Sequence, residues 1–355
     1  MTLRTKAIAC LTFSVVALAA PRAGSAQDYE YDPADVQERR SAFVARMAGE
    51  HGFEPDVVAE LLGGATVQQS ALNAISRPVE RVVPWYEYRE IFLDEARIDA
   101  GVRFWAEHEA LLEETAASFG VDPEMILAIL GIETLYGQRM GSYRVIDALS
   151  TLAFAYPPRA DFFASELEAY LLIYRDEGPA ILDAQGSYAG AMGAGQFIPT
   201  SYRAYAVDAD GDGRRDLWQS WSDILGSIAN YLARHGWRFG EPIAVAALQG
   251  SGPAVTPGNR LGLDQTVGAL RARGYEFSSE LADGLDAMLV AVEQSDEDTA
   301  YFVGLQNFHV ITRYNRSVKY ALAALELSEA IEQRYRERNA IVDRGQAWNE
   351  PAQVQ

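Results

Sequence analysis

Residues 122–137 read DPEMILAILGIETLYG, and this stretch carries the strongest structural and chemical signals in the chain. Asp122 can cap a helix, Pro123 suits the first helical turn, and Glu124 places an acid at the positive end of the helix dipole. The apolar residues that follow predict a helix that continues to Glu133.

Glu133 lies in the middle of the apolar face of this predicted helix. At 100° per residue, Ile126 falls about 20° from it and Ile129 about 40°. Such a position is costly for an ionised carboxylate unless it is paired or its pKa rises, and a raised pKa is what a general acid needs near neutral pH. Gly137, on the same face, is expected to leave room for a ligand. The helix alone leaves two interpretations open, a catalytic acid or a buried Glu that is paired within the structure.

Residues 186–199, GSYAGAMGAGQFIP, hold four glycines together with Gln, Met and two aromatic residues. The segment has neither the Gly-Lys-Ser/Thr ending nor any cation of a phosphate-binding loop. Its small residues let the backbone approach a flat ligand, and Ser187 and Gln196 can bond hydroxyl or amide groups of that ligand. A tightly packed helix–turn junction is the alternative interpretation.

Taken together, these residues resemble the membrane-bound lytic murein transglycosylase B family and its soluble relatives. The resemblance spans about residues 77–330, with the motifs in the same order. Besides 131–137 and 186–199, the matching motifs are DALSTLAF at 147–154, YP at 156–157 with Arg159, ANY at 229–231, HGW at 235–237 and ITRYN at 311–315. The resemblance implies a mainly α (α+β) fold, with a lysozyme-like helical core, a helical flanking domain and a small β-containing domain.

The resemblance also implies a reaction. Lytic transglycosylases break the β-1,4 bond between N-acetylmuramic acid and N-acetylglucosamine in peptidoglycan without adding water, and they need no cofactor for this chemistry. One Glu performs both proton transfers in that family, and Glu133 is the matching residue here. This accounts for the absence of an obvious second carboxylate, which a two-carboxylate glycosidase would need. A hydrolytic muramidase and a non-catalytic peptidoglycan-binding protein are the alternatives.

A set of substrate-binding residues follows from the same resemblance. Ser187 would bond Glu133 or a nearby sugar, Gln196 would hold an N-acetyl or hydroxyl group, and Met192 would pack on a sugar face. The further residues expected to line the cleft are Tyr231, Tyr314, Asn315, Tyr88 and Arg159. For each aromatic side chain, core packing is the alternative.

Residues 208–216, DADGDGRRD, form an acidic loop that is close to an EF-hand. Its acids, and the Gly at the sixth position, are typical of a Ca²⁺ loop. Gln219 stands where a bidentate Glu is expected, and the resemblance implies that a later acid, Asp223, closes the loop instead. The expected ligands of a structural Ca²⁺ are Asp208, Asp210, Asp212, Arg214 and Asp223. A solvated acidic turn is the alternative interpretation.

The charge and the first residues bear on where the protein works. A net charge of −20 makes nucleic acid and anionic membranes poor partners, although such a charge can equally serve solubility. Residues 1–26 are typical of a signal peptide, with Arg4 and Lys6 before a short apolar run and a cut after Ala26. Cys10 falls inside that run rather than at its end, which favours a periplasmic protein over a lipid-tethered or uncleaved one.

The remaining pattern predicts how the mature chain is divided. No transmembrane segment is predicted, and we expect a monomer whose partners are peptidoglycan glycan strands and the cell-wall synthesis machinery. Short apolar runs at 243–248 and 287–292, flanked by Gly, Pro, Asn and Asp, predict strands between 240 and about 305. The predicted parts are a helical flanking domain at 27–120, joined by a helix at about 315–340 that Asn315 would cap; a catalytic core at 121–239; a small β-containing domain at 240–310; and a frayed tail at 342–355.

Overall fold

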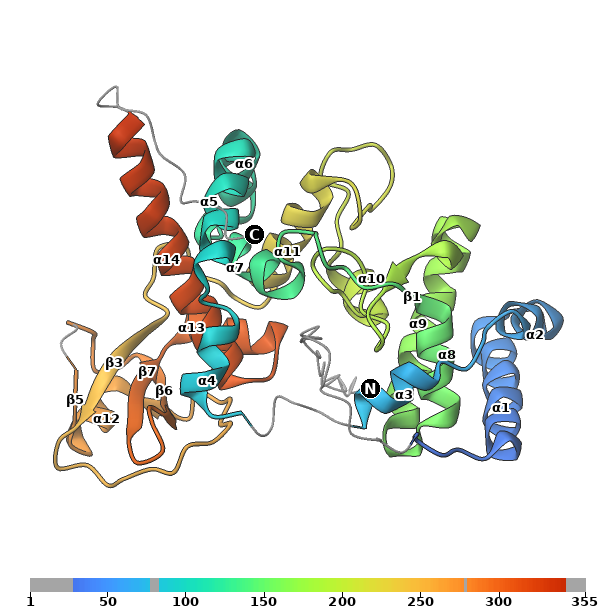
Figure 1. The fold of residues 1–355 in the computed structure, drawn as a ribbon, viewed down its shortest axis with the longest axis horizontal. Coiled ribbons are helices and arrows are strands. Elements are labelled where there is room, and N and C mark those ends of the chain that lie inside the picture. Colours follow the sequence, from blue (N-terminus) through green and yellow to red (C-terminus); the bar gives the residue numbers. More distant parts are fainter. Residues whose placement is uncertain (1–27, 77–82, 278–279, 343–355) are drawn as a thin grey trace, which may run out of the picture. The chain divides into compact units, whose positions relative to one another are not determined.

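The structure is a computed structural model, and it describes residues 28–76, 83–277 and 280–342. The fold is mainly α with a small antiparallel sheet, so the predicted fold class is confirmed (Figure 1). The predicted signal peptide and all but the first residue of the predicted tail lie outside the described residues.

The chain divides into two compact units. Unit 1 holds residues 83–128 and the described residues from 229 onward, and unit 2 holds the described residues up to 76 together with 129–228. The predicted helical region at 27–120 is therefore shared between the two units. The division falls inside two helices, α7 (Pro123–Thr134) and α11 (Trp221–Arg234).

Unit 2 is built around a helix that is buried on all sides. Every residue of α8 (Val145–Ala155) is buried, and α8 packs against α1, α3 and α9. The other elements of unit 2 are α1 (Pro33–His51), α2 (Pro55–Gly63), α3 (Gln69–Ile75), β1 (Tyr143–Arg144), α8 (Val145–Ala155), η2 (Pro157–Arg159), α9 (Ala160–Glu177), η3 (Pro179–Asp183), β2 (Gln185–Gly186) and α10 (Pro199–Tyr205). Strands β1 and β2 pair antiparallel.

Unit 1 combines helices with a five-stranded antiparallel sheet in the order β4-β6-β7-β3-β5. Its helices are α4 (Trp85–Tyr88), η1 (Arg89–Ile91), α5 (Glu95–Glu107), α6 (Glu109–Phe119), α12 (Val267–Ala272), α13 (Gln306–Tyr314) and α14 (Val318–Val342). Its strands are β3 (Ala244–Gln249), β4 (Gln265–Thr266), β5 (Tyr275–Glu276), β6 (Asp286–Glu293) and β7 (Thr299–Gly304). The apolar run 287–292 forms β6, which is buried on both faces, as a continuous apolar strand predicts.

Two helix boundaries differ from the sequence-based expectation. Within the helical domain predicted at 27–120, residues 85–119 form four helical pieces, and α5 starts at Glu95 because the Asp94 side chain accepts a hydrogen bond from Arg97 N (2.9 Å). The cap of α14 is Ser317, whose Oγ accepts from Tyr320 N at 3.2 Å. Asn315 instead ends α13, with its N–H donating to Ile311 O. The prediction that Asn315 caps the last helix is therefore wrong.

Among the described residues, no single helix is both long and apolar enough to cross a membrane. Helices α6 and α7 reach that threshold only when they are counted together, and a 110° bend separates them.

Candidate active site

Glu133 is the second-to-last residue of α7, and its side chain is 7% exposed. Every residue from Met125 to Thr134 is buried, so this end of the helix is enclosed on all sides rather than on one face. Burial and the negative end of the helix dipole both disfavour an ionised carboxylate at this position.

The backbone after Glu133 enters a left-handed turn. Leu135, Tyr136 and Gly137 have φ values of 51°, 58° and 81°, a conformation that costs a non-glycine residue about 1–2 kcal/mol. A Cβ added to Gly131 would lie 2.6 Å from the Tyr136 hydroxyl oxygen, so only Gly allows this ring to fold back over the helix.

Gly137 was expected to leave space beside the helix for a ligand, but this space is occupied. A Cβ there would lie 2.8 Å from Cη2 of Trp221, so the space beside Gly137 is filled by the indole ring. The expectation that Gly137 leaves room for a ligand is wrong, because an aromatic residue distant in sequence occupies that room.

The Gly-rich segment 186–199 folds into tight, internally bonded turns. Ser187 Oγ accepts from Ala191 N at 3.0 Å and from Ala189 N at 3.3 Å. Both bonds use oxygen lone pairs, so the hydroxyl proton of Ser187 can still be donated to another group. The segment therefore has features of both interpretations, a packed junction and a surface with polar groups that can bind a ligand.

Gln196 adopts a left-handed φ of 51° and is 7% exposed. Its Nε2 donates to Met140 O (3.1 Å) and to Gly193 O (2.9 Å), which uses both amide hydrogens. The carbonyl oxygen Oε1 is therefore the part of the side chain that can accept a hydrogen bond from an N–H or O–H of a ligand.

Met192 is completely buried, at 0% exposed. Its backbone pairs with Phe197 through two hydrogen bonds of 2.8 and 2.9 Å, and this paired turn keeps residue 192 in the interior of unit 2. Met192 therefore contacts protein on all sides in this structure, and its packing on a sugar face stays a proposal.

The candidates in unit 1 form two aromatic clusters. Tyr231 contacts Tyr314 edge-on, with ring centroids 4.7 Å apart, and donates its hydroxyl proton to Arg313 O. Tyr88 lies in α4, 5.3 Å from the Phe92 ring. All three tyrosines are at most 3% exposed, so each makes the core contacts of the packing alternative.

Two further candidates belong to different units. Asn315, in unit 1, is 4% exposed at the end of α13. Arg159, in unit 2, lies over the Phe162 ring at 4.3 Å from its centroid. The structure therefore places the candidates in separate groups: the Glu133 region with the Gly-rich segment and Arg159 in unit 2, and the tyrosines with Asn315 in unit 1.

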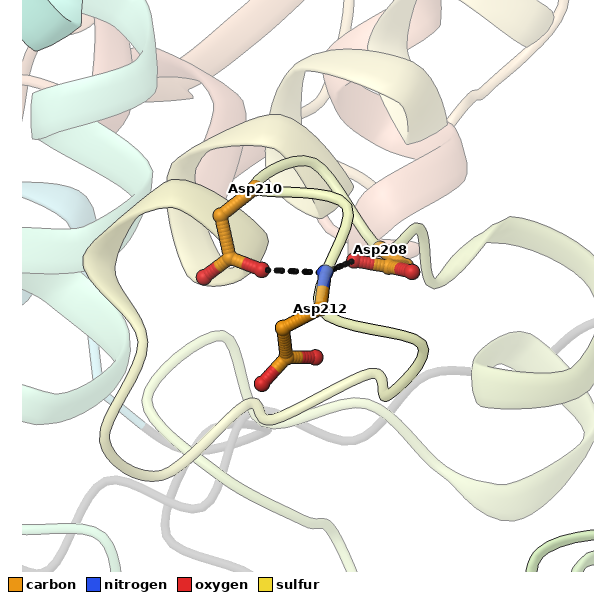
Figure 2. Close-up of side chains that lie close together, drawn as sticks. All are labelled: Asp208, Asp210 and Asp212. Atoms are coloured by element: carbon orange, nitrogen blue, oxygen red, sulfur yellow. Dashed lines mark hydrogen bonds between the residues drawn. The ribbon is translucent and has the colours of Figure 1, made fainter.

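The acidic loop gathers three carboxylates. Oxygens of Asp208, Asp210 and Asp212 lie within 4.8 Å of one another, and all three residues are exposed (Figure 2). Figure 2 shows the backbone nitrogen of Asp212 between the carboxylates of Asp208 and Asp210, to which it donates at 3.1 and 3.2 Å. Arg214 N donates to the Asp212 carboxylate at 2.8 Å. Three hard oxygen donors in one loop fit the preference of Ca²⁺.

Asp223 has a different place from the one expected. It is completely buried, and its two carboxylate oxygens accept from Ala209 N and Asp216 N, each at 2.7 Å. Burial raises the pKa of this carboxyl above its ordinary value. Because both oxygens bind backbone N–H groups, Asp223 closes the base of the loop and does not lie with the three aspartates.

Glu166 is a buried acid that the sequence interpretation missed. It lies in α9, is 3% exposed, and accepts from Thr200 N at 2.9 Å, while its other oxygen lies 2.8 Å from Thr200 Oγ1. Burial raises the pKa of Glu166 to about 7, despite the opposing effects of these hydrogen bonds and of Arg159. The available signal was a Glu between the apolar residues Phe163 and Leu167, and Thr200 lies in the first turn of α10, directly after the Gly-rich segment.

Replacing Glu166 by Gln should change how stability depends on pH. The carboxyl pKa is raised from 4.5 in the unfolded chain to about 7 in the folded protein, so its contribution to stability is full below pH 4.5 and is lost as the pH rises to about 7. Gln resembles the protonated acid at every pH, and the variant should therefore gain stability relative to the wild type between pH 4.5 and 7. Urea unfolding of both proteins across this range measures the difference, and a constant difference would contradict the assignment.

Comparison with known proteins identifies the class to which this arrangement belongs. The family described as Transglycosylase SLT domain matches residues 35–329. The chain therefore belongs to this family and is, by class, a lytic transglycosylase.

Individual relatives agree with this class. Membrane-bound lytic murein transglycosylase B of Escherichia coli (strain K12) is 39% identical over 298 residues, which cover 81% of each chain. The structure of Escherichia coli Slt35 in complex with calcium is 37% identical and covers 84% of this chain and 93% of that one, with a TM-score of 0.74. The structure of SltB3 from Pseudomonas aeruginosa in complex with NAG-anhNAM-pentapeptide is 32% identical and covers 84% of this chain and 80% of that one, with a TM-score of 0.69.

Proposed function

We propose that this protein cleaves the β-1,4 bond between N-acetylmuramic acid and N-acetylglucosamine in peptidoglycan and forms 1,6-anhydromuramoyl ends, with Glu133 as the only acid and base. The observation that carries the proposal is the place of Glu133, buried in the last turn of α7 and followed at once by a strained turn. The anhNAM-containing ligand of SltB3 is the kind of product that this reaction forms.

The proton transfers follow from this environment. Protonated Glu133 donates to the glycosidic oxygen as the bond from that oxygen to C1 breaks, and the N-acetylglucosamine leaves with a free hydroxyl. The resulting carboxylate then removes the proton from the muramoyl C6 hydroxyl, whose oxygen forms the new bond to C1. Glu133 is thereby protonated again, and no water is consumed.

The polar groups of the Gly-rich segment would bind the substrate. Ser187 has a proton to donate to Glu133 or to a sugar hydroxyl, and Gln196 Oε1 can accept from an N–H or O–H of an N-acetyl sugar. Arg159, Tyr88, Tyr231, Tyr314 and Asn315 remain proposals for the rest of the cleft. We place the enzyme in the periplasm, where such a substrate lies and where the predicted signal peptide would direct it.

The products distinguish this reaction from hydrolysis of the same bond. Digestion of purified sacculi should release muropeptides whose reducing ends are lighter by one water than those of a muramidase digest, as seen by mass spectrometry. Full-mass reducing ends would support the muramidase alternative, and no release of soluble fragments would support a non-catalytic wall-binding protein.

We also propose that Asp208, Asp210 and Asp212, with the backbone of Arg214, hold a structural Ca²⁺. The three clustered carboxylates and the calcium complex of Slt35 support this role. Held between ligands from one loop, the cation would fix the loop and take no part in bond cleavage. Asp223 would support the loop from its base, through its bonds to Ala209 N and Asp216 N.

Calcium should raise the unfolding temperature of the chelator-treated protein. At 100 times the dissociation constant the ion stabilises the folded state by about 2.7 kcal/mol, which corresponds to about 5–10 °C for a unit of this size. The double variant Asp210→Asn with Asp212→Asn should lose the shift. Asp223→Asn should melt earlier with and without calcium but keep the shift, and a wild-type protein with no shift would contradict the calcium site.

A further inference from the structure

The residue that follows Glu133 joins the end of α7 to the Gly-rich segment. Thr134 Oγ1 lies 2.8 Å from Ala194 O and accepts from Gly137 N at 3.0 Å. Leu130 O is also near, at 3.4 Å. A hydroxyl has one proton to donate, and the shorter contact to Ala194 takes it. Since Thr134 is 1% exposed, water does not compete for these bonds.

The Gly-rich segment is held firmly at the point that Thr134 contacts. Ala194 N donates to Leu217 O at 2.8 Å, so both polar backbone groups of Ala194 are bonded. The preceding Gly193 has a φ of 65°, and a Cβ there would lie 2.3 Å from Leu217 O. Gly193 O in turn accepts from the backbone and side-chain amides of Gln196, at 3.1 and 2.9 Å. The bond from Thr134 therefore ends on the same turn that fixes Gln196.

The second bond of Thr134 closes the left-handed turn after Glu133. Three consecutive residues with positive φ persist only where surrounding contacts impose that conformation. The bond that Gly137 N donates to Thr134 Oγ1 is one of these contacts, and its acceptor belongs to the residue directly bonded to Glu133. One hydroxyl thus connects the helix end, the strained turn and the Gly-rich segment.

We propose that Thr134 is a positioning residue, whose hydroxyl fixes the Glu133 carboxyl relative to Ser187 and Gln196. The inference rests on the proposed function of Glu133. Serine can make the same two hydrogen bonds, whereas valine has nearly the same shape as threonine but can neither donate nor accept.

The test compares Thr134→Val and Thr134→Ser with the wild type on soluble, N-acetylated glycan strands. Misplacing a reacting group by about 1 Å can cost about 10²-fold in rate, so Thr134→Val should lower kcat by about 10- to 100-fold. KM should stay within about twofold, because the polar groups that bind the sugar are retained. Thr134→Ser should keep kcat within about threefold of the wild type.

Thr151→Val is the matched control. Thr151 is also 1% exposed in unit 2, and its hydroxyl contacts one backbone N–H, of Gln68 at 2.9 Å, and one carbonyl, of Thr66 at 3.4 Å. Its loss should lower the unfolding temperature and leave kcat within about twofold of the wild type.

Any other result contradicts either the positioning role of Thr134 or the proposed function. The positioning role is overturned if Thr134→Val keeps its kcat, if only KM changes, if Thr134→Ser is as slow as Thr134→Val, or if Thr151→Val is equally slow. A Thr134→Val protein that does not fold while Thr151→Val folds would also overturn it, because the hydroxyl would then be a general requirement of the fold. A wild-type protein that cleaves no glycan would instead contradict the proposed function.

Discussion

Glu133→Gln should lower the rate of glycan-strand cleavage by about 10³-fold, within the range that a positioned acid and base contributes. Gln has nearly the same shape as Glu and can still bond the substrate, but it cannot donate a proton to the leaving oxygen or remove one from the C6 hydroxyl. The measurement is the release of soluble fragments from purified sacculi, together with a sedimentation assay of binding to the same sacculi. Binding should remain within about threefold of the wild type.

Glu166→Gln is the matched control for this substitution, because Glu166 is also a buried acid of unit 2. The control variant should retain most of the cleavage activity at neutral pH. If Glu133→Gln solubilises sacculi at the wild-type rate, Glu133 is not the acid. If binding is lost along with cleavage, the loss of rate cannot be ascribed to proton transfer by Glu133.

Gly141→Ala should lower the free energy of unfolding of unit 2 by about 4 kcal/mol, the sum of backbone strain and a steric clash. Gly141 has a φ of 92°, and a Cβ there would lie 2.1 Å from Gly186 O and 2.7 Å from Ser187 N. Since both neighbours are backbone atoms, neither can turn away as a side chain could. The start of the Gly-rich segment must therefore move, and cleavage should fall with it.

Gly178→Ala measures the effect of backbone strain without that of a steric clash. Gly178 has nearly the same φ, 93°, and no heavy atom within 4 Å of its added Cβ. This variant should lose only about 1–3 kcal/mol and keep its cleavage activity. Urea unfolding, followed by circular dichroism, gives both values, and equal losses for the two variants would contradict the close backbone approach at Gly141.

The parts of the fold and of the candidate site that could be predicted mostly follow from local patterns in the sequence. The start of α7 at Pro123 agrees with its proline and its first acid, and the continuous apolar run 287–292 forms a strand as expected. The Asp122 carboxylate, which was expected to cap this helix, instead accepts from Trp237 Nε1 at 2.8 Å and from Gly240 N at 3.0 Å. The three clustered aspartates of the acidic loop were also visible, because their spacing along a short loop is enough to bring them together.

The features that could not be predicted depend on contacts between distant residues. The space beside Gly137 is filled by Trp221, which is distant from it in the sequence. Asp223 was predicted to join the other acids, but its burial directs both oxygens to backbone N–H groups. Met192 is buried by the turn that pairs it with Phe197, and no local pattern distinguishes such a methionine from one that is exposed.

Glu166 and Thr134 also form side-chain hydrogen bonds that the sequence could not predict. Thr134 lies in α7 and Glu166 in α9, but the partner that gives each residue a specific place comes from the Gly-rich segment or from the turn directly after it. Helix α7 was predictable because the hydrogen bonds within a helix are local. The side-chain bonds that hold the Gly-rich segment against α7 and α9 were not, since their partners are 60 and 34 residues apart.

Cleavage of purified glycan strands in water enriched in ¹⁸O tests the central claim most directly. If the C6 hydroxyl of the muramoyl residue attacks C1, the new ends are 1,6-anhydro sugars, and mass spectrometry should find no ¹⁸O in them. If water attacks C1, every new reducing end carries one ¹⁸O atom, and this result would contradict the non-hydrolytic reaction proposed for Glu133.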